Sequence, residues 1–486
     1  MSRINTNIPS LVAQRVLTKQ NAAMNNSLFR LSTGYRINTG RDDPAGLIAS
    51  ENLRAEKTAI QAAITNISRA NNVVGSAEGG LVEINSLLIE LEDLVDRSAN
   101  EAGISQDERN ANQLQIDAIL TSINRIASNT EFQGSKLLSG DLAYTTSGVT
   151  AASNYFQNVE INAARLPNDS YRTVTVEVTG SAQLGQLTWT GSEVQNGTVT
   201  IQVAGNRGTE TLTFSSGTTI TDMAAAINQA TDLTGVSAFA STGGTDTLVL
   251  NSSNYGSSEF VSVQVLTDGG TGFATNLSAG DQGDGRDNGQ DASVSINGVT
   301  AITDGLRASM RSQALSVDID LKAAFGTRDG SLNSSQTFYI TGGGANFMLS
   351  PTVSLSGMES LGIQAVDTGS LGDSSSGYLS SLATGQINAL NTRNYVNAQN
   401  IIRAAQDHVS QLRGRLGAFQ KNTLQSTANS LQITFENTAA AESTIRETDF
   451  ASETSNMTRA QILVQTATNT LRLANAQPQN VLALLS

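Results

Sequence analysis

The strongest constraint on the fold is an apolar residue at every seventh position between residues 53 and 95. These residues are Leu53, Ile60, Ile67, Val74, Leu81, Leu88 and Val95. Three positions after five of them stand Ala63, Ala70, Ala77, Ile84 and Leu91. Two apolar positions in each heptad form one stripe along a helix that packs lengthwise on other helices. The pattern predicts a long helix from Pro44 and a second amphipathic helix over about residues 106–127.

Both ends of the chain show the same seven-residue spacing. The large side chains of the two terminal stripes are Leu17, Met24, Leu28, Leu31, Met457, Val464 and Leu471. A further long helix is expected over 390–446, before a break near residues 447–450. Two interpretations of the terminal stripes remain open. They belong to ordinary amphipathic helices of one globule, or to helices that meet each other and equivalent helices of neighbouring subunits.

The middle of the chain, residues 140–385, has a different pattern. Stretches such as TVTVEVTG, GTVTIQVAG and DTLVLNSS alternate strictly and are rich in Val and Thr, which predicts short antiparallel strands. Thr219 is expected to cap one helix over residues 220–230. The predicted fold is a multidomain α+β protein, in which long coiled-coil helices from both termini pack together and a β-rich surface module is inserted between them.

This organisation predicts three divisions of the chain. Residues 1–33 and 454–486 are expected to form inner terminal helices. Residues 34–140 and 385–453 are expected to form an outer helical core with linking loops and a β-hairpin. Residues 141–384 are expected to form the variable β-rich insertion exposed at the surface.

Composition excludes several classes of function. The net charge of −14 argues against nucleic-acid binding, because phosphate contacts require clustered Lys and Arg. The absence of cysteine excludes disulfides and thiolate metal sites. The single histidine, His408, excludes a zinc-protease helix with two histidines. We expect no catalytic residue, no metal and no cofactor. No apolar run is long enough for a membrane span, and the first residues lack the apolar segment of a secretory signal.

The stretch LSTGYRINTGRDDPAGLIASENLR, residues 31–54, is interpreted as a linker between two helices. Its glycine spacing does not fit a phosphate-binding loop. Gly34 can end the first helix in the left-handed conformation, and Asp42 or Asp43 can cap the next helix, which starts at Pro44. Contacts within the chain or with a neighbouring subunit are expected for Arg36, Arg41, Asp42, Asp43 and Arg54.

Three motifs in the correct order resemble the bacterial flagellins, the subunits of the flagellar filament. The linker resembles the family's motif between two helical layers. NRIASNTEFQGSKLLSG (124–140) resembles the segment leading into the family's β-hairpin, and ETSNMTRAQILVQTATNTLRLANAQPQNVLALLS (453–486) resembles its C-terminal helix. TLTFSSGTTITDMAAAINQATDLTGVSA (211–238) resembles a ββαβ module of many flagellin insertions.

The resemblance implies a filament subunit for swimming motility that is secreted, extracellular and not an enzyme. Its implied partners are further copies of itself, the flagellar export apparatus and a chaperone, and the filament cap and hook-junction proteins, with no nucleic acid and no membrane. The assembly interface is expected at the terminal coiled coil, with the residues Ile4, Ile8, Leu11, Leu17, Met24, Leu28, Leu31, Met457, Val464, Leu471, Val481, Leu482 and Leu485.

One stretch departs from the family pattern. Flagellins recognised by the Toll-like receptor of animal innate immunity carry a stretch similar to LQRVRELAVQSAN, and LIELEDLVDRSAN (88–100) stands here. Leu88 and Leu94 are kept, whereas Glu90 and Glu92 replace two arginines that contact the receptor. Because this reverses both charges, recognition by the receptor is expected to be weak or absent.

Two alternatives to a plain filament subunit remain open from the residues. A hook–filament junction protein would have similar helical ends, although its tail is less similar to this one. A flagellin carrying an enzyme in the insertion would need a metal-independent mechanism, because the chain has one histidine.

Overall fold

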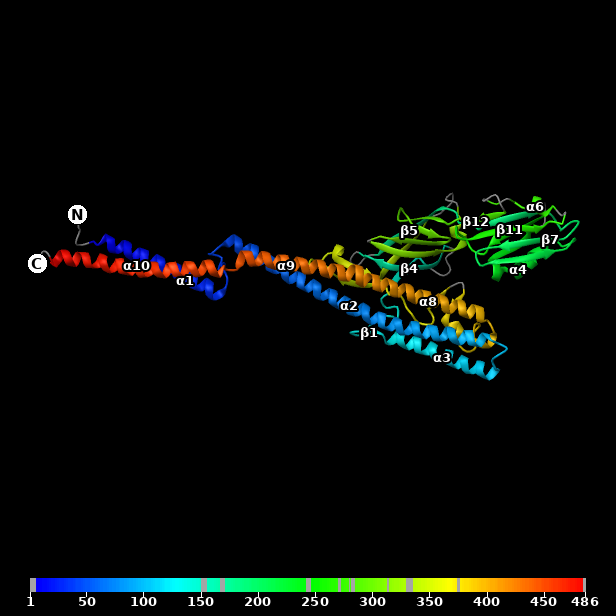
Figure 1. Ribbon diagram of the computed structural model, residues 1–486, viewed down its shortest axis with the longest axis horizontal. Helices are drawn as coiled ribbons and strands as arrows, with labels where there is room; N and C mark the ends of the chain where they lie inside the picture. Colours follow the sequence, from blue (N-terminus) through cyan, green and yellow to red (C-terminus); the bar gives the residue numbers. More distant parts are fainter. Residues whose placement is uncertain are drawn as a thin grey trace. The chain divides into compact units, whose positions relative to one another are not determined.

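The computed structural model describes residues 6–149, 155–166, 171–241, 246–269, 272–278, 280, 285–312, 314–328, 335–373 and 376–483, with side chains up to residue 477. These residues form two compact units. The first comprises Met1–Asn71, Met348–Gly357 and Phe419–Ser486, and the second comprises Asn72–Phe347 and Met358–Ala418. The long helices are α1 (Ile8–Thr33), α2 (Pro44–Ala99), α3 (Gln106–Asn129), α8 (Tyr395–Ala418), α9 (Ser426–Arg446) and α10 (Phe450–Ala483) (Figure 1).

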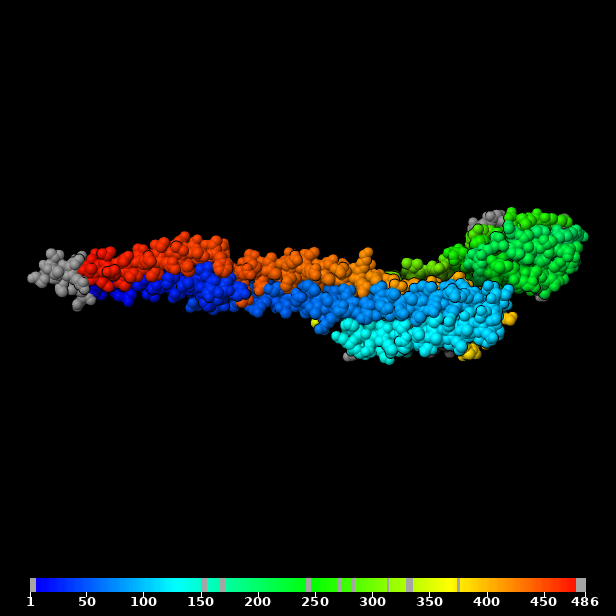
Figure 2. Space-filling view, turned by 60° about the horizontal axis from the view of Figure 1, so that its bottom comes forward, coloured from blue at the N-terminus to red at the C-terminus, as the bar shows by residue number. Residues whose placement is uncertain are grey.

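In the first unit, α1 and α10 form an antiparallel pair of helices (Figure 2). The Asn7 amide donates to the Ala474 carbonyl over 2.8 Å, and Arg30 lies 3.9 Å from Glu453 at the other end of the pair. Asn7 also caps α1, because its side chain accepts from the Ser10 backbone N–H. The structure therefore pairs the two terminal stripes within one chain.

The heptad stripe of α2 is half-buried at Leu53 and buried from Ile60 onward. From Ile60 to Leu91 its members are at most 1% exposed, and they are Ile60, Ala63, Ile67, Ala70, Val74, Ala77, Leu81, Ile84, Leu88 and Leu91. The predicted second helix is α3, and Ser105 and Glu108 form a capping box at its start. A two-residue hairpin of β1 (Glu131–Phe132) and β2 (Ser135–Lys136) follows α3, as the resemblance implied.

The predicted helix over 390–446 differs from the structure in two respects. It begins at Tyr395, after a short 3₁₀ turn over Leu390–Thr392. It also contains a π-helix over Phe419–Gln425, between α8 and α9. The buried side chains of α8 include Ile402, Val409, Leu412 and Leu416, as the sequence pattern predicted.

In the second unit, a β-sandwich forms the first part of the insertion. One sheet has the strand order β14-β13-β5-β18-β3 and the other has the order β15-β16-β17-β4. Their bounds are β3 Tyr144–Ser147, β4 Phe156–Ala164, β5 Arg172–Gly180, β13 Ser293–Ile296, β14 Val299–Thr300, β15 Ile302–Asp304, β16 Arg307–Arg311, β17 Leu315–Leu321 and β18 Ser335–Gly343. Inward side chains of both sheets share one core, in which the Phe156 ring packs edge-on against Phe325 and Phe338.

A second β module is inserted within this sandwich. Gln183 and Gln290 exchange two backbone hydrogen bonds of 2.9 Å where the chain enters and leaves the module. It contains the sheets β6-β10-β9 and β12-β11-β7-β8 around their own core. The bounds are β6 Gln186–Thr190, β7 Val199–Ala204, β8 Thr209–Phe214, α4 Ile220–Gln229, α5 Thr231–Thr234, β9 Val236–Ser241, β10 Thr247–Ser252, β11 Phe260–Thr267, α6 Phe273–Asn276 and β12 Arg286–Asn288.

The remaining elements are short. They are α7 Ala323–Gly326, β19 Ala345–Met348, β20 Met358–Leu361, β21 Gly372–Asp373, β22 Gly377–Tyr378, and 3₁₀ turns at Leu355–Gly357 and Leu379–Leu382. Helical ends and a central sheet-rich region make this the mixed α+β fold that the sequence predicted.

Candidate functional site

The seam between α1 and α10 is lined by small residues. Ala13 of α1 and Ala460, Ala467 and Ala474 of α10 are between 5% and 7% exposed. The larger seam residues are half-buried beside them, and they are Leu17, Met24, Leu31, Met457, Val464 and Leu471. Alanine lets two helix backbones approach closely, so these small residues mark where α1 and α10 pack on each other.

A second set of large apolar side chains on the pair is left uncovered. On α1 it includes Ile8 (57% exposed), Leu11 (58%) and Phe29 (53%), and on α10 it includes Ile462 (58%) and Leu473 (69%). Leu28 of α1 is also exposed. Exposed apolar side chains that stand singly are ordinary, whereas a contiguous apolar patch is typical of an interaction surface.

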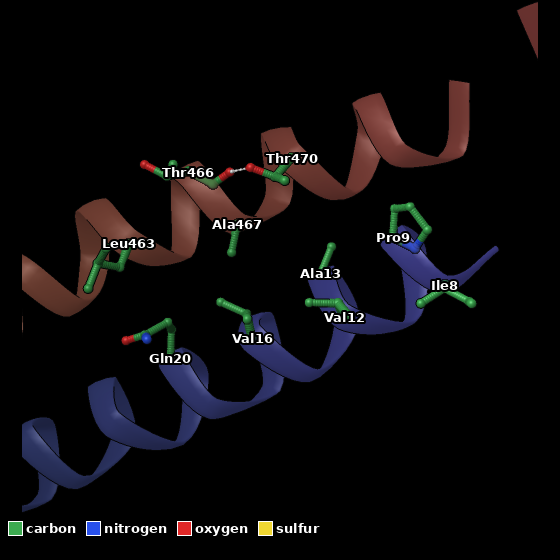
Figure 3. Close-up of a pocket in the computed structure, with 10 residues that line it drawn as sticks. All are labelled: Ile8, Pro9, Val12, Ala13, Val16, Gln20, Leu463, Thr466, Ala467 and Thr470. Atoms are coloured by element: carbon green, nitrogen blue, oxygen red, sulfur yellow. Dashed lines mark hydrogen bonds between the residues drawn. The ribbon is translucent and has the colours of Figure 1, made fainter. Parts of the chain in front are cut away.

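One of these side chains, Ile8, lines a groove of about 510 Å³ between the two helices (Figure 3). Its lining residues are Ile8, Pro9, Val12, Ala13, Val16, Gln20, Leu463, Thr466, Ala467 and Thr470. Ile8, Val12 and Val16 are four residues apart and therefore lie on one face of α1. We call Ile8, Val12, Val16 and Leu463 the exposed row.

The predicted interface residues therefore fall into three groups. The six large seam residues face the partner helix within the chain. Ile8, Leu11 and Leu28 are exposed. Ile4 and Leu485, with the side chains of Val481 and Leu482, lie outside the described residues. The sequence interpretation missed Val12, Val16 and Leu463, although the four-residue spacing after Ile8 was a signal for the first two.

The linker joins α1 to α2 through two helix caps. Gly34 ends α1 with φ +74°, the left-handed conformation that favours glycine. The Asp43 carboxylate accepts from the Gly46 backbone N–H over 2.9 Å and so caps α2. Asp42 instead accepts hydrogen bonds within the linker, from the Thr39 backbone N–H and the Thr39 hydroxyl. These hydrogen bonds lower the pKa of the Asp42 carboxyl.

The same linker pairs with the segment between α9 and α10. Tyr35 and Glu447 form an antiparallel bridge, and the Arg36 backbone N–H donates to the Arg446 carbonyl over 2.7 Å. The Arg36 guanidinium donates to the Ile445 carbonyl over 2.6 Å. Arg446 lies over the Tyr35 ring, with 4.9 Å between the guanidinium carbon and the ring centroid. We call residues 34–43 together with 446–449 the joint.

The predicted linker arginines have different surroundings. Arg36 makes a contact within the chain, to a backbone carbonyl. Arg54 lies 3.7 Å from Glu51 on the same helix, and both side chains are about half exposed. Arg41 is exposed, and the described part of the chain provides no ion pair for it.

The stretch that differs from receptor-recognised flagellins lies on α2. Leu88 and Leu94 are buried within the unit, whereas Glu90 is exposed. Glu92 is half-buried, and it accepts from Arg403 over 3.2 Å and from Gln406 over 2.9 Å. The reversed charge at Glu92 therefore has a partner within the chain.

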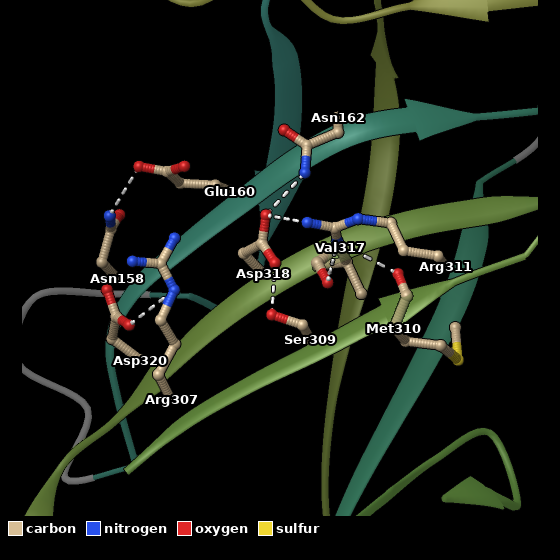
Figure 4. Close-up of polar contacts among 10 residues, drawn as sticks. All are labelled: Asn158, Glu160, Asn162, Arg307, Ser309, Met310, Arg311, Val317, Asp318 and Asp320. Atoms are coloured by element: carbon tan, nitrogen blue, oxygen red, sulfur yellow. Dashed lines mark hydrogen bonds and ion pairs between the residues drawn. The ribbon is translucent and has the colours of Figure 1, made fainter. Parts of the chain in front are cut away.

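Polar side chains of the sandwich form a cluster around Asp318 (Figure 4). Asp318 is 7% exposed and accepts from Asn162 over 2.7 Å, from Ser309 over 2.6 Å and from Arg311 over 2.8 Å. Burial alone would raise the pKa of Asp318, but these hydrogen bonds together lower it. All three donors hold the ionised carboxylate, which is the arrangement of a buried structural group.

His408 lies in a polar cleft of about 600 Å³ in the second unit, and its Nε2 is 2.7 Å from the Gln364 amide oxygen. Burial lowers the pKa of His408 below its ordinary value of 6.5. The negative charge of Glu160 acts in the opposite direction, and the positive charges of Arg415 and Arg307 lower the pKa further. Burial also raises the pKa of Asp320 in this cleft. Within the residues that the structure describes, no group of three acidic or histidine side chains is placed to hold a metal.

His408 should make stability depend on pH. Because its folded pKa is lowered, the unfolded chain binds a proton that the folded chain does not, so the free energy of unfolding falls as pH drops through about 6.5. His408→Asn should remove this slope in urea unfolding followed by far-UV circular dichroism, since the chain has one histidine. Gln411→Asn, in the same cleft, should keep it. An unchanged slope in His408→Asn would contradict this assignment.

Three segments match the sequence patterns of one family. Residues 4–143 match the bacterial flagellin N-terminal helical region, residues 399–485 match the bacterial flagellin C-terminal helical region, and residues 199–254 match the flagellin hook IN motif. Flagellin C of Vibrio cholerae serotype O1 is 27% identical over 482 residues, which cover 99% of each chain. Flagellin of Salmonella typhimurium strain LT2 is 28% identical over 514 residues, again with 99% of each chain covered.

Among solved structures, FliC from Burkholderia pseudomallei aligns with 74% of this chain and 99% of its own, at 15% identity and a TM-score of 0.24. Among the residues that the structure describes, no helix has the length and apolar character of a membrane span.

A structural subunit that self-assembles carries apolar surface that its own fold leaves uncovered. The paired terminal helices of this chain carry such a surface. The chain belongs to the bacterial flagellin family. It is a structural subunit of the bacterial flagellar filament, the extracellular helical polymer of swimming motility.

Proposed function

We propose that this subunit polymerises through the exposed row of the α1–α10 pair. We also propose that the chain has three divisions, which are the inner helices (1–33 and 454–486), the outer core (34–140 and 385–453) and the surface insertion (141–384). The observation that supports the proposal is the exposed row itself, because the seam already satisfies the pairing of the two helices within one chain. The side chains of the exposed row are 40–57% exposed, so each gains about half of the roughly 1.5–3 kcal/mol of complete burial when a neighbouring copy covers it.

Polymerisation of the purified chain tests this proposal. A row that is the same on every copy and contacts a different patch of the next copy produces an open helical polymer when the rotation between copies does not close a ring. Salt or short filament fragments added to the monomer should therefore start growth, followed by light scattering and electron microscopy. A chain that stays monomeric at every concentration, even with fragments present, contradicts the proposal.

Within the joint, we expect substitution of Arg36 to impair polymerisation more than substitution of Arg41. Arg36→Ala removes the hydrogen bond to the Ile445 carbonyl, which leaves a carbonyl unpaired and loosens the connection of α1 to α2. We expect about a tenfold rise in the critical concentration for polymerisation, since a charged hydrogen bond contributes about 1.5–3 kcal/mol and part of it is recovered by water.

Arg41→Ala is the matched variant, because Arg41 stands in the same linker without an ion pair among the described residues. If Arg41 and Arg54 act within one chain only, their substitution by alanine leaves the critical concentration unchanged. A larger effect for Arg41 than for Arg36 would instead make Arg41 a contact to the neighbouring copy, and would contradict the role assigned to Arg36.

The subunit is proposed to act without catalysis and without a cofactor, and to meet the export apparatus, a chaperone, the filament cap and the hook-junction proteins on its way into the filament. Nucleic acid and membrane are not proposed as partners, since the net charge of −14 opposes binding to phosphate-rich surfaces.

Recognition by the innate immune receptor is proposed to be weak. A reporter-cell assay with purified monomer should show a response at least about tenfold below that of a flagellin with two arginines at the equivalent positions, because each opposite-sign replacement costs more than about 1 kcal/mol. Glu90→Arg should raise the response, since Glu90 is exposed. Glu92→Arg should raise it less, because it would also repel Arg403. Full potency of the unchanged chain would contradict the proposal.

A further inference from the structure

The helix that begins at Tyr395 and ends at Arg446 has an irregular centre. The regular helix α8 passes directly into the seven-residue π-helix Phe419–Gln425, which passes into α9. π-turns are rare, and they place more residues in each turn than an α-helix does. A π segment of this length inside a regular helix therefore needs a cause in the packing.

The cause lies in the spacing of the buried side chains. In α8, Ile402, Val409 and Leu416 are seven positions apart. From Leu424 onward the spacing is again seven, through Leu431 to Thr438. Between Leu416 and Leu424 it is eight. In a continuous α-helix, one additional residue would rotate every later side chain by about 100° around the axis.

The π segment takes up this additional residue. With it, all six side chains are at most 9% exposed on both sides of the irregularity, and they are Ile402, Val409, Leu416, Leu424, Leu431 and Thr438. The buried stripe of α2, by contrast, keeps steps of seven from Ile60 to Val95 without interruption. The additional residue therefore belongs to the C-terminal helix alone.

Two glycines show independently that the helix is weak at this place. Gly414 and Gly417 stand within the last turns of α8, and a Cβ built on either meets no atom within 4 Å. Packing within the chain therefore does not require them to be glycine. Glycine at exposed helical positions costs about 1 kcal/mol each relative to alanine. The sequence thus lowers helix stability directly before the π segment.

We propose that residues 414–425 are a built-in deformable segment, in which the π-helix takes up one residue so that the buried stripe stays in register on both sides. The segment opens and re-forms more readily than α8 before it or α9 after it. The deformable segment is a property of the monomer, so its test does not depend on the proposed mode of polymerisation.

Single-residue deletions test the proposal. Deleting Asn422, which is exposed in the π segment, restores a spacing of seven between Leu416 and Leu424. We expect a folded chain with an unchanged or higher urea midpoint, in which amide exchange over 414–425 slows by about tenfold or more as the π-helix becomes α-helix. Deleting Ser410, which is exposed in α8, is the matched control. It should lower the midpoint, because it turns Leu412 and Leu416 away from the buried side.

Two results would overturn the proposal. If deletion of Asn422 lowers the urea midpoint as much as deletion of Ser410, the π segment does not take up a surplus residue. If amides of residues 414–425 in the unchanged chain exchange as slowly as those of Ile402–Leu412 and Leu431–Thr438, the segment is not deformable.

Discussion

A chain that ends before Glu453 should not polymerise. This truncation removes α10, with its half of the seam and with Leu463 of the exposed row, so that α1 loses its partner helix. Several apolar side chains contribute about 1.5–3 kcal/mol each, and their loss should raise the critical concentration by more than about a thousandfold. Light scattering and electron microscopy with added filament fragments measure this directly.

The control is a larger deletion elsewhere. Excision of residues 184–289 removes the nested β module, whose entry and exit at Gln183 and Gln290 are hydrogen-bonded to each other, so the ends can be joined by a short link. This variant should polymerise like the full chain. If the truncated chain forms filaments, or if the excised chain does not although it folds, the role given to the terminal helices is wrong.

Replacing two residues of the exposed row should block polymerisation while leaving the monomer folded. The double variant Val12→Asn, Val16→Asn changes side chains that are 44% and 41% exposed in the single chain, so it leaves the seam of α1 and α10 intact. Covering two valines that are already more than half-buried contributes about 1–3 kcal/mol together, and the critical concentration should rise by about tenfold or more.

The matched variant is Gln14→Asn, Thr18→Asn on another face of α1, where both side chains are exposed and do not line the groove. It introduces the same two asparagines into the same helix and should polymerise normally. Equal polymerisation by both double variants would show that the exposed row is not the contact surface. Equal loss in both would show that helix propensity, rather than the row, decides assembly.

The parts of this fold that were predictable depend on regular spacing. The heptads of α2 predicted a stripe that is buried almost completely, and the strict alternation of Val and Thr predicted strands such as β5 and β7. The cap Thr219 and the left-handed Gly34 followed from local backbone chemistry. Each of these signals acts within one element, so one sequence was sufficient.

Other features depend on contacts between distant segments. Asp42 and Asp43 are equally able to cap a helix before Pro44, and only the linker geometry shows that Asp43 does so. For Arg36 the sequence predicted contacts within the chain or with a neighbouring subunit but not the partner itself, which is a carbonyl 409 positions away. The π segment was missed because Phe419 stands between Leu416 and Leu424 and makes their spacing resemble an ordinary helical stripe. Val12, Val16 and Leu463 lie outside the predicted terminal stripes, and the groove that they line is formed by both helices together.

An image of the assembled filament, at a resolution that places side chains, tests the central claim most directly. It should show Ile8, Val12, Val16 and Leu463, which are exposed in the single chain, covered by neighbouring copies while α1 and α10 remain paired through Ala13, Ala460 and Ala467. A filament in which the exposed row faces solvent, and in which copies contact one another only through α2, α3 and the insertion, would contradict the claim.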